Sequence, residues 1–557
     1  MLPEPPASPA PPHAAEPAAA HLETGERRLL VGLVLLGLLA RLALLLAAPR
    51  LIRWDEADYL LLGKSLWSGQ GYRIAGVIDL HFPPLLPLLF GPFVRGFRNP
   101  EWASNLWYLV CGALLPWPVY RLARRIYRPM GASESMGRRV AGWSAALTAL
   151  FPLLVISPLH WGTMSEPPYL LLLFLGIDWT HRALRRRSAR DAALGGAAFA
   201  LAYLTRSEGV VAGLVAAAAL GGWGIAGRAV AGRRALAPFL AFALTFTALA
   251  LPYVLFLRRH SGQWRLTGKT GITLELWAPT MRQDPAAYDR AVARLDSRGE
   301  EILWYSPERF AIPGLLERGP AEILARLRGN LERIGAGLWR RWPFLIPIVL
   351  LAGWGVLATA RTRRERGDLL FLALMALPPL VFLPVRIQTR FFVPWVPIFL
   401  IWACAALVLV GDRVARRAGR PRLRHAAPAA AALGLALLWP PVFARGQRTL
   451  DLGHKQLGLW LRDHSEPRVV LMTRDPAVAL YADRESVRCP HADLDAILRY
   501  ARRRGAELWA TDAEELTVVK PHLAALLDPD RRPSGMLEIH RIESRSGPNL
   551  VLRLPPA

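Results

Sequence analysis

Long apolar runs separated by short polar connections make up most of the chain between residues 29 and 446. A helix needs about 20 apolar residues to cross the hydrocarbon core of a bilayer. By this measure the pattern predicts a mainly α-helical membrane protein with about eleven transmembrane helices. The predicted segments are approximately 29–48, 103–122, 140–159, 165–182, 191–205, 208–226, 235–257, 343–360, 369–385, 391–411 and 426–446.

The fifth predicted segment is short, and the sixth follows it at once. Only the polar triplet Arg206, Ser207 and Glu208 separates the two. They are either two tilted helices or one interrupted element.

The composition agrees with a membrane protein and changes how the charge is interpreted. Of 557 residues, 53% are hydrophobic, which is too many for a soluble chain of this length. A net charge of +26 would suggest a nucleic-acid partner in a soluble protein. Here the arginines stand mostly in short runs between apolar segments, which is typical of cytoplasmic loops. The three cysteines form no CxxC or Cys/His cluster, so we expect neither a disulfide framework nor a structural zinc site.

Basic connections predict the orientation in the membrane. With the N-terminus inside, every arginine cluster falls on the cytoplasmic side, as the positive-inside rule requires. This orientation places residues 49–102, the turn near 160–165, residues 258–342 and the tail from 447 outside. The clusters are Arg121/Arg124/Arg125/Arg128, Arg182/Arg185/Arg186/Arg187, Arg228/Arg233/Arg234, Arg361/Arg363/Arg364/Arg366 and Arg413/Arg416/Arg417/Arg420.

The remaining segments suggest a disordered tail, helices at the membrane surface and a small domain. Residues 1–27 are rich in proline and alanine and are expected to be disordered. Residues 84–97 are apolar but too short to span, and predict an interfacial or re-entrant helix. Residues 28–446 would form the membrane domain, and 447–557 a small extracytoplasmic α/β domain with alternating strand-like and helix-like stretches. The spacing of Ile323, Leu324, Leu327 and Leu331 predicts an amphipathic helix on the outer surface.

Two adjacent acids follow the first apolar segment. Asp55 and Glu56 stand in the sequence WDEADY, and Lys64 follows in the same loop. Ionised groups at the mouth of a membrane bundle are costly unless something uses them. A carboxylate there can accept a proton from a hydroxyl. Alternatively, the two acids simply favour the N-terminus of a helix.

Further polar groups fall on the predicted outer side. His81 precedes Phe82-Pro83-Pro84 and is either a phosphate-binding group or merely an interfacial polar residue. Glu166 follows Ser165 at the point where the chain enters the membrane again. It is either an acid in the first turn of a helix or a second carboxylate of an external pocket. Arg206 and Glu208 form either a buried structural pair or a site for an anionic head group.

Two arginines occupy a very short outer turn. Arg386 and Arg390 either reach back to the interface or bind phosphate through their guanidinium groups. Two other motifs are set aside. Residues 268–270 (GKT) lack the earlier glycine of a phosphate-binding loop. Asp493 and Asp495 (DLD) are better explained as acids at the start of a helix than as a metal motif.

Together these residues resemble the GT-C superfamily of membrane glycosyltransferases, and most closely the glycosyltransferase family 39 group. That group includes protein O-mannosyltransferases, bacterial lipid A aminoarabinose transferases and related rhizobial lipopolysaccharide sugar transferases. The likeness covers roughly residues 29–411. The matching residues are Asp55-Glu56, His81-Phe82-Pro83-Pro84 and the run to Gly91, Ser165-Glu166-Pro167, Leu204 to Gly209, and Arg390-Phe391-Phe392 with Pro394 and Pro397.

The resemblance implies an enzyme of the bacterial cytoplasmic membrane with its active site on the outer face. The donor would be a sugar on a polyprenyl phosphate, and the acceptor a lipid, a glycan or a protein. Asp55 would be the general base, with Glu56 assisting substrate binding. Arg206, Arg386 or Arg390 would hold the lipid phosphate near His81. Lys64, Glu166 and Glu208 complete the candidate substrate-binding residues.

Two departures from the family pattern leave the donor open. His81 stands where the aminoarabinose transferases tend to have lysine, and Ser207 stands where proline is frequent. Metal use varies across the superfamily; a divalent metal is compatible with it, although the sequence shows no dedicated site. Two rival functions also stay open. A secondary transporter or lipid flippase has buried charges and broken helices too, and a non-enzymatic scaffold would present the tail domain.

Overall fold

The computed structural model describes residues 23–127, 134–161, 165–226, 235–340 and 342–555. Most of the predicted disordered tail lies outside these residues. Its last part differs from the prediction, because residues 24–27 belong to the first helix, α1 (Thr24–Ala47). A capping box explains this start: Glu23 and Glu26 each accept a hydrogen bond from the other's backbone N–H.

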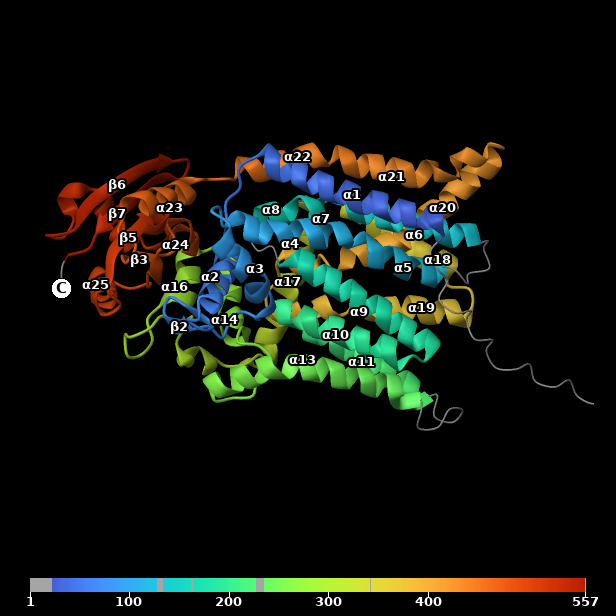
Figure 1. Cartoon of the computed structure of the whole chain (residues 1–557), viewed down its shortest axis with the longest axis horizontal. Helices are drawn as coiled ribbons and strands as arrows, with labels where there is room; N and C mark the ends of the chain where they lie inside the picture. The colour runs from blue at the N-terminus through green and yellow to red at the C-terminus, as the bar shows by residue number, and fades with distance from the viewer. Residues whose placement is uncertain (1–22, 128–133, 162–164, 227–234, 341, 556–557) are drawn as a thin grey trace, which may run out of the picture.

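Helices form a bundle along the long axis of the molecule (Figure 1). Four stretches of the described chain are long and apolar enough to cross a membrane, namely Thr24–Ala47, Ala237–Ser261, Trp395–Arg417 and Pro421–Arg448. Other helices of the bundle are shorter or carry more charge. The bundle elements after α1 are α4 (Glu101–Leu114), α5 (Pro116–Tyr127), α6 (Glu134–Leu150), α7 (Pro152–Val155), α8 (Ser157–Trp161), α9 (Glu166–Arg186), α10 (Ala189–Thr205), α11 (Gly209–Ala226), α13 (Ala237–Ser261), α18 (Leu345–Thr359), α19 (Arg363–Leu374), α20 (Trp395–Arg417), α21 (Ala426–Leu437) and α22 (Trp439–Arg448).

The predicted apolar segments fall on these helices in order, but the predicted number of eleven spans is not confirmed, because only four stretches of the described chain are long and apolar enough to cross. The segments 103–122 and 426–446 each fall on two helices, α4 with α5 and α21 with α22. The pair 191–205 and 208–226 is two separate helices, α10 and α11. The segment 369–385 is helical only to Leu374 and then continues as a 3₁₀ turn over Pro378–Phe382. Prolines at that point remove the N–H groups that a longer α-helix would need.

The segment 140–159 is also not one helix, since α6 ends at Leu150 and the chain turns at Phe151. Pro152 and Pro158 explain the break. Carbonyl groups freed by it find side-chain donors: Trp439 Nε1 donates to the Leu150 carbonyl at 2.8 Å, and the Tyr108 hydroxyl to the Val155 carbonyl at 2.6 Å. Irregular backbone inside a bundle is stable only when it is satisfied in this way.

The largest core of buried apolar side chains lies inside the bundle, where α20 is buried along most of its length. Small residues allow the helices to approach closely. A Cβ at Gly355 of α18 would lie 2.0 Å from the carbonyl oxygen of Trp402 in α20. Close backbone packing of this kind is a common way to associate helices where no water is available to be excluded.

At one end of the bundle, opposite the start of α1, lie short elements and a small sheet domain (Figure 1). The predicted short helix at 84–97 is present as α3, and the predicted amphipathic helix as α17. Leu324 and Leu331 of α17 are exposed, as expected for an apolar face without a protein partner. The short elements are α2 (Asp55–Trp67), β1 (Arg73–Ile74), β2 (Val77–Ile78), α3 (Leu85–Gly96), α14 (Thr270–Glu275), α15 (Trp277–Arg282) and α16 (Pro285–Ala293), and the longer helix α17 spans Pro320–Arg340.

The C-terminal residues form an α/β unit around a five-stranded sheet with the order β4-β3-β5-β7-β6. Strands β4, β3 and β5 are parallel, whereas β7 and β6 are antiparallel to their neighbours. Strand β4 has the short, mostly polar sequence ESVR. The elements are α23 (Gly453–His464), β3 (Val470–Thr473), α24 (Pro476–Ala482), β4 (Glu485–Arg488), α25 (Leu494–Arg503), β5 (Ala506–Asp512), β6 (Leu537–Ser544) and β7 (Gly547–Arg553).

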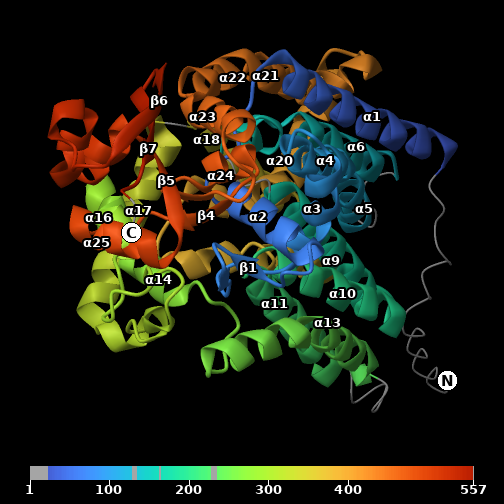
Figure 2. The same ribbon diagram turned by 60° about the vertical axis from the view of Figure 1, so that its left-hand side comes forward.

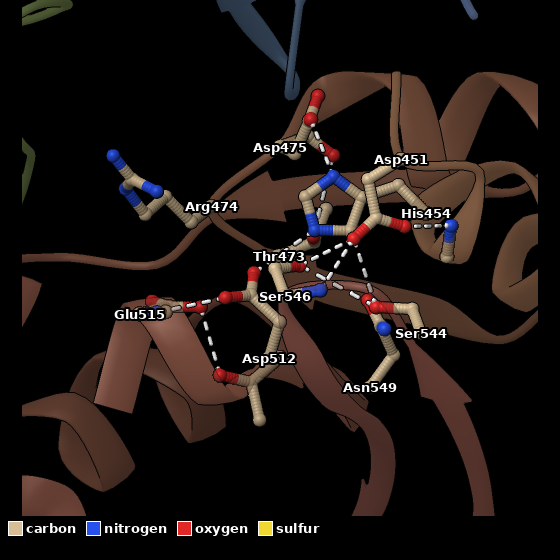
Figure 3. Close-up of polar contacts among 12 residues, drawn as sticks. Asp451, His454, Thr473, Arg474, Asp475, Asp512, Glu515, Ser544, Ser546 and Asn549 are labelled. Atoms are coloured by element: carbon tan, nitrogen blue, oxygen red, sulfur yellow. Dashed lines mark hydrogen bonds and ion pairs between the residues drawn. The ribbon is translucent and has the colours of Figure 1, made fainter. Parts of the chain in front are cut away.

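A histidine between two carboxylates ties α23 to the carboxyl ends of β3 and β5 (Figure 3). His454 Nδ1 lies 2.8 Å from Asp475, and its Nε2 lies 2.9 Å from Asp512. Burial would lower the pKa of His454, but the two carboxylates outweigh burial and hold that pKa well above its ordinary value. Each ring nitrogen therefore donates one hydrogen bond, and the imidazolium fixes the start of α23 on the sheet.

Helix α2 lies between this unit and the bundle in both views (Figure 1, Figure 2). It packs against α3 on one side and α24 on the other. Polar contacts join the two sides: the Tyr481 hydroxyl donates to Glu101 of α4 at 2.6 Å, and Lys455 contacts the same carboxylate at 2.6 Å. The loop that carries Asp55 is thus held from both directions.

Candidate active site

Asp55 is the first residue of α2, and the backbone turns sharply just before it. Trp54 has φ 50°, a value that residues with a side chain rarely adopt. Such a conformation costs of order 1–3 kcal/mol and persists only where its surroundings hold it. The helix N-terminus favours a carboxylate at this position. The turn therefore directs an ionised group to the junction of the bundle and the outer elements.

Arg390 lies beside Asp55 in space, although the two residues are 335 positions apart in the sequence. It belongs to a 3₁₀ turn, Thr389–Phe392, just before α20. Its Nη2 lies 3.2 Å from Asp55 Oδ2, and its Nε donates to Gln388 at 2.8 Å. The two side chains are 19% and 28% exposed, so the pair remains accessible to a ligand. The structure brings together the two residues that the sequence suggested as base and phosphate ligand.

A second guanidinium lies close to this pair and is held by two acids. Arg206 caps the C-terminus of α10. Its Nη1 donates to Glu166 at 2.7 Å and to Ser165 at 2.8 Å, and its Nε donates to Glu208. All three charged side chains are at most 13% exposed. Two carboxylates compensate the charge of Arg206, which favours the interpretation of Arg206 and Glu208 as a buried structural pair. Arg206 nevertheless remains close enough to Asp55 to act on its charge.

Lys269 is a site residue that the sequence did not reveal. It lies just before α14, in the segment that was set aside as a false phosphate-binding loop. Gly268 lets this segment pack closely, since a Cβ there would lie 1.9 Å from the Leu80 carbonyl oxygen. Tyr203 holds the same loop by donating to the Leu266 carbonyl at 2.6 Å. No local pattern in a polar loop could indicate that it folds over a site more than 200 residues away.

The ammonium group of Lys269 lies 4.9 Å from the centre of the Phe82 ring. Among the described residues, no carboxylate lies within salt-bridge distance of it. Burial lowers the pKa of Lys269, and nearby Asp55 counteracts this. An incompletely compensated cation with a partly apolar surrounding is a ready partner for an anionic ligand.

The cations around Asp55 control its ionisation. Burial would raise the pKa of Asp55, but the charges of Arg390, Lys269 and Arg206 outweigh burial and hold that pKa below its ordinary value. Asp55 is therefore ionised at neutral pH. A carboxylate in this state orients a hydroxyl by accepting its hydrogen bond, although it is a weak base.

His81 lies near these groups but contacts an aromatic ring. Its imidazole packs against Trp304 with ring centres 3.9 Å apart, and its side chain is 6% exposed. Burial and the nearby charges of Lys269 and Arg309 lower the pKa of His81 well below its ordinary value. The ring is neutral at physiological pH, so Lys269, and not His81, supplies the positive charge on this side.

Three predicted residues are not brought to Asp55. Glu56 is fully buried and bonds to Arg50 and Ser104, which explains it as a structural anchor of α2. Lys64 pairs with Asp483 of the C-terminal unit. Arg386 contacts the Tyr288 hydroxyl of α16 at 3.4 Å. Asp493 caps α25 by accepting from the Ala496 N–H, which agrees with its interpretation as a helix-start acid.

In the described part of the chain, no three His, Cys, Asp or Glu side chains are arranged to hold a metal ion. Two carboxylates of the site, Glu166 and Glu208, are both bonded to Arg206.

Comparison with known proteins adds the fold. No protein-family model and no curated protein sequence matches the chain. It is similar to the structure of ArnT from Cupriavidus metallidurans in the apo state, with 14% identity, a TM-score of 0.58, and coverage of 96% of this chain and 99% of that one. The same protein bound to undecaprenyl phosphate gives 14% identity and a TM-score of 0.54, over 97% and 100% of the two chains. The chain is also similar to an Archaeoglobus fulgidus oligosaccharyltransferase complexed with Zn and sulfate, with 14% identity, a TM-score of 0.52, and coverage of 88% of this chain and 70% of that one.

ArnT and the oligosaccharyltransferase both have the GT-C fold. The chain shares this fold with them. At 14% identity the likeness concerns the fold alone. Within this fold, Asp55 begins α2, and α2 lies between the C-terminal unit and the helix bundle (Figure 1).

Proposed function

We propose that this chain is a membrane glycosyltransferase. It would move a sugar from a polyprenyl-phosphate donor to a lipid, glycan or protein acceptor on the outer face of the bacterial cytoplasmic membrane. The observation that carries the proposal is the ionised Asp55 beside Arg390, Lys269 and Arg206 at one end of an apolar bundle. The fold supports it, because ArnT, a protein of the same fold, has been seen bound to undecaprenyl phosphate.

The proposal includes the predicted topology. About eleven helices over residues 28–446 would form the catalytic membrane domain, and residues from 447 an extracytoplasmic α/β domain. The amphipathic α17, with exposed Leu324 and Leu331, would lie against the outer leaflet.

Lys269 and Arg390 are the groups we assign to the donor phosphate. Among the described residues, Arg206 has two carboxylate partners and Arg390 has one, which is partly exposed. Lys269 has no carboxylate within salt-bridge distance in that part of the chain, and its ammonium group lies over the Phe82 ring. A phosphate that binds Arg390 competes with Asp55 for the same guanidinium. Donor binding would then free Asp55 from its ion pair and strengthen it as a base.

The reaction would be a direct displacement. The acceptor oxygen forms a bond to the anomeric carbon while the bond from that carbon to the phosphate oxygen breaks. The phosphate leaves with the electron pair, stabilised by Lys269 and Arg390, and needs no acid because it is already anionic. Asp55 takes the acceptor proton, and a positioned base of this kind typically contributes about 10²- to 10⁴-fold to the rate.

Replacing Lys269 with alanine tests the phosphate site. We expect the variant to bind a labelled polyprenyl-phosphate sugar roughly 10- to 100-fold more weakly, since a hydrogen bond to a charged group contributes about 1.5–3 kcal/mol. Titration of the purified full chain in lipid nanodiscs measures this dissociation constant. Lys64→Ala is the matched control, because Lys64 pairs with Asp483 away from the site. Equal donor affinity of the Lys269 variant and the wild type would place the anion elsewhere.

Counterflow assays in proteoliposomes separate the proposal from a transporter or flippase. Sugar transfer without lipid exchange supports the enzyme, and exchange without transfer supports the rival.

A further inference from the structure

A second carboxylate stands one helical turn from Asp55 on the same face of α2. Asp58 is only 3% exposed. Among the described residues, its Oδ1 has no hydrogen-bond partner. Glu56, the other acid of this turn, is equally buried but is bonded to Arg50 and Ser104. An unpartnered buried acceptor costs about 1–3 kcal/mol, so Asp58 needs another explanation than the stability of the fold.

The groups that face Asp58 come from four other segments. Arg488 at the end of β4 is the opposing cation, and Tyr305 is close enough for the charges of Arg488 and Asp58 to act on it as well. Asp79, after β2, and Asp475, after β3, add negative charge, as does Asp55 on α2 itself. The carboxyl group is thus surrounded by more acids than bases. Leu61, one helical turn after Asp58 on α2, lines a surface pocket together with Tyr305 and Arg488, the two residues coupled electrostatically to Asp58.

The pKa values of the two acids on this helix face are shifted in opposite directions. Burial raises the pKa of Asp58 to about 7, against the charge of Arg488. Asp55 has its pKa held below the ordinary value by its cations. A proton acceptor works best when its pKa lies near the working pH, which describes Asp58 better than Asp55.

We propose that Asp58 is the proton relay of the transfer reaction, receiving through Asp55 the proton that leaves the acceptor hydroxyl. The inference rests on the proposed glycosyltransferase function and extends it. The acceptor O–H bond breaks as the new bond to the anomeric carbon forms, and its proton passes to the Asp55 carboxylate. The proton then moves to the Asp58 carboxylate, which releases it to water before the next turnover. Asp55 returns to its ionised state, and no other reactant is needed.

The pH profile of kcat/KM is the test, because it reports the ionisation of the free enzyme. The purified full chain in nanodiscs is assayed between pH 5 and 9 with a polyprenyl-phosphate sugar. Only the ionised form of Asp58 accepts a proton, so the wild-type rate is expected to rise with pH through about 7. Asp58→Asn should lower the rate by about 10-fold or more and remove this rise, and Asp58→Glu should restore it with a shifted midpoint.

Asp79→Asn is the matched control. Asp79 is also buried, and its Oδ1 likewise has no hydrogen-bond partner in the described part of the chain, but its Oδ2 accepts the N–H groups of His81 and Phe82. That variant should keep the rise even if its rate falls, with the midpoint moved somewhat lower because the charge of Asp79 helps to raise the pKa of Asp58. Infrared difference spectra give an independent reading: a protonated-carboxyl band of the wild type should titrate near pH 7 and be missing in Asp58→Asn.

The outcomes separate the two proposals. Transfer that depends on Asp55, with an unchanged profile and band in Asp58→Asn, overturns the relay and leaves the enzyme in place. Donor binding without transfer by the wild type overturns both.

Discussion

Replacing Asp55 with asparagine is expected to lower sugar transfer by about 10²- to 10⁴-fold, the usual contribution of a positioned base. The amide keeps the size of the side chain but accepts no proton. The fold should survive, because the lost ion pair with Arg390 is partly exposed and such pairs contribute little to stability. Turnover of a labelled polyprenyl-phosphate sugar, beside a thermal unfolding curve, measures both effects.

The same variant also distinguishes a general base from a donor-binding residue. Because Arg390 then has no competing carboxylate, donor affinity should stay equal or increase while kcat falls. Asp483→Asn is a suitable control, since its carboxylate pairs with Lys64 on the far side of α2. Undiminished transfer by the Asp55 variant with normal expression would refute the base assignment. Parallel losses of affinity and turnover would instead make Asp55 a binding residue.

Arg206→Ala should have the largest effect on stability. The guanidinium holds Glu166 and Glu208 in surroundings where all three side chains are at most 13% exposed. Removing one partner of a buried ion pair typically destabilises by about 3–5 kcal/mol, because the remaining charge has no compensation. Here both Glu166 and Glu208 would lose this guanidinium. We expect a clear drop in the thermal unfolding temperature, measured in detergent or nanodiscs, together with loss of transfer.

A variant without any of these charges distinguishes structure from function. Arg206→Met combined with Glu166→Gln and Glu208→Gln should recover much of the lost stability, since apolar or neutral groups often replace a buried ion pair without loss. Transfer should remain impaired, because Arg206 also helps to keep Asp55 ionised. Full recovery of transfer would assign the triad to stability alone. An unchanged unfolding temperature in Arg206→Ala would contradict the buried pair itself.

The sequence predicted much of the bundle because the bilayer restricts what an apolar segment can do. Helices were located by length and hydropathy, and α3 was found because it is too short to span. The breaks at Phe151 and after Leu374 were missed although prolines mark both. Their energetic cost depends on distant donors such as Trp439, which no local pattern reveals.

The candidate site was predicted where a charge stands out from apolar neighbours. Asp55, Arg206 and Arg390 fulfil that condition, and the structure brings them together. Lys269 does not, because it lies in a polar loop whose packing is decided by Gly268 and Tyr203. Glu56 shows the opposite problem. It adjoins Asp55 in sequence, but successive residues of a helix point in different directions, and it turns toward Arg50.

A structure of the protein with polyprenyl phosphate bound, determined by electron cryo-microscopy in nanodiscs, tests the central claim most directly. The account predicts the phosphate within hydrogen-bonding distance of Lys269 and Arg390, with Asp55 released from its guanidinium and facing the acceptor space. A phosphate bound at another place while the pair of Asp55 and Arg390 stays closed would contradict it.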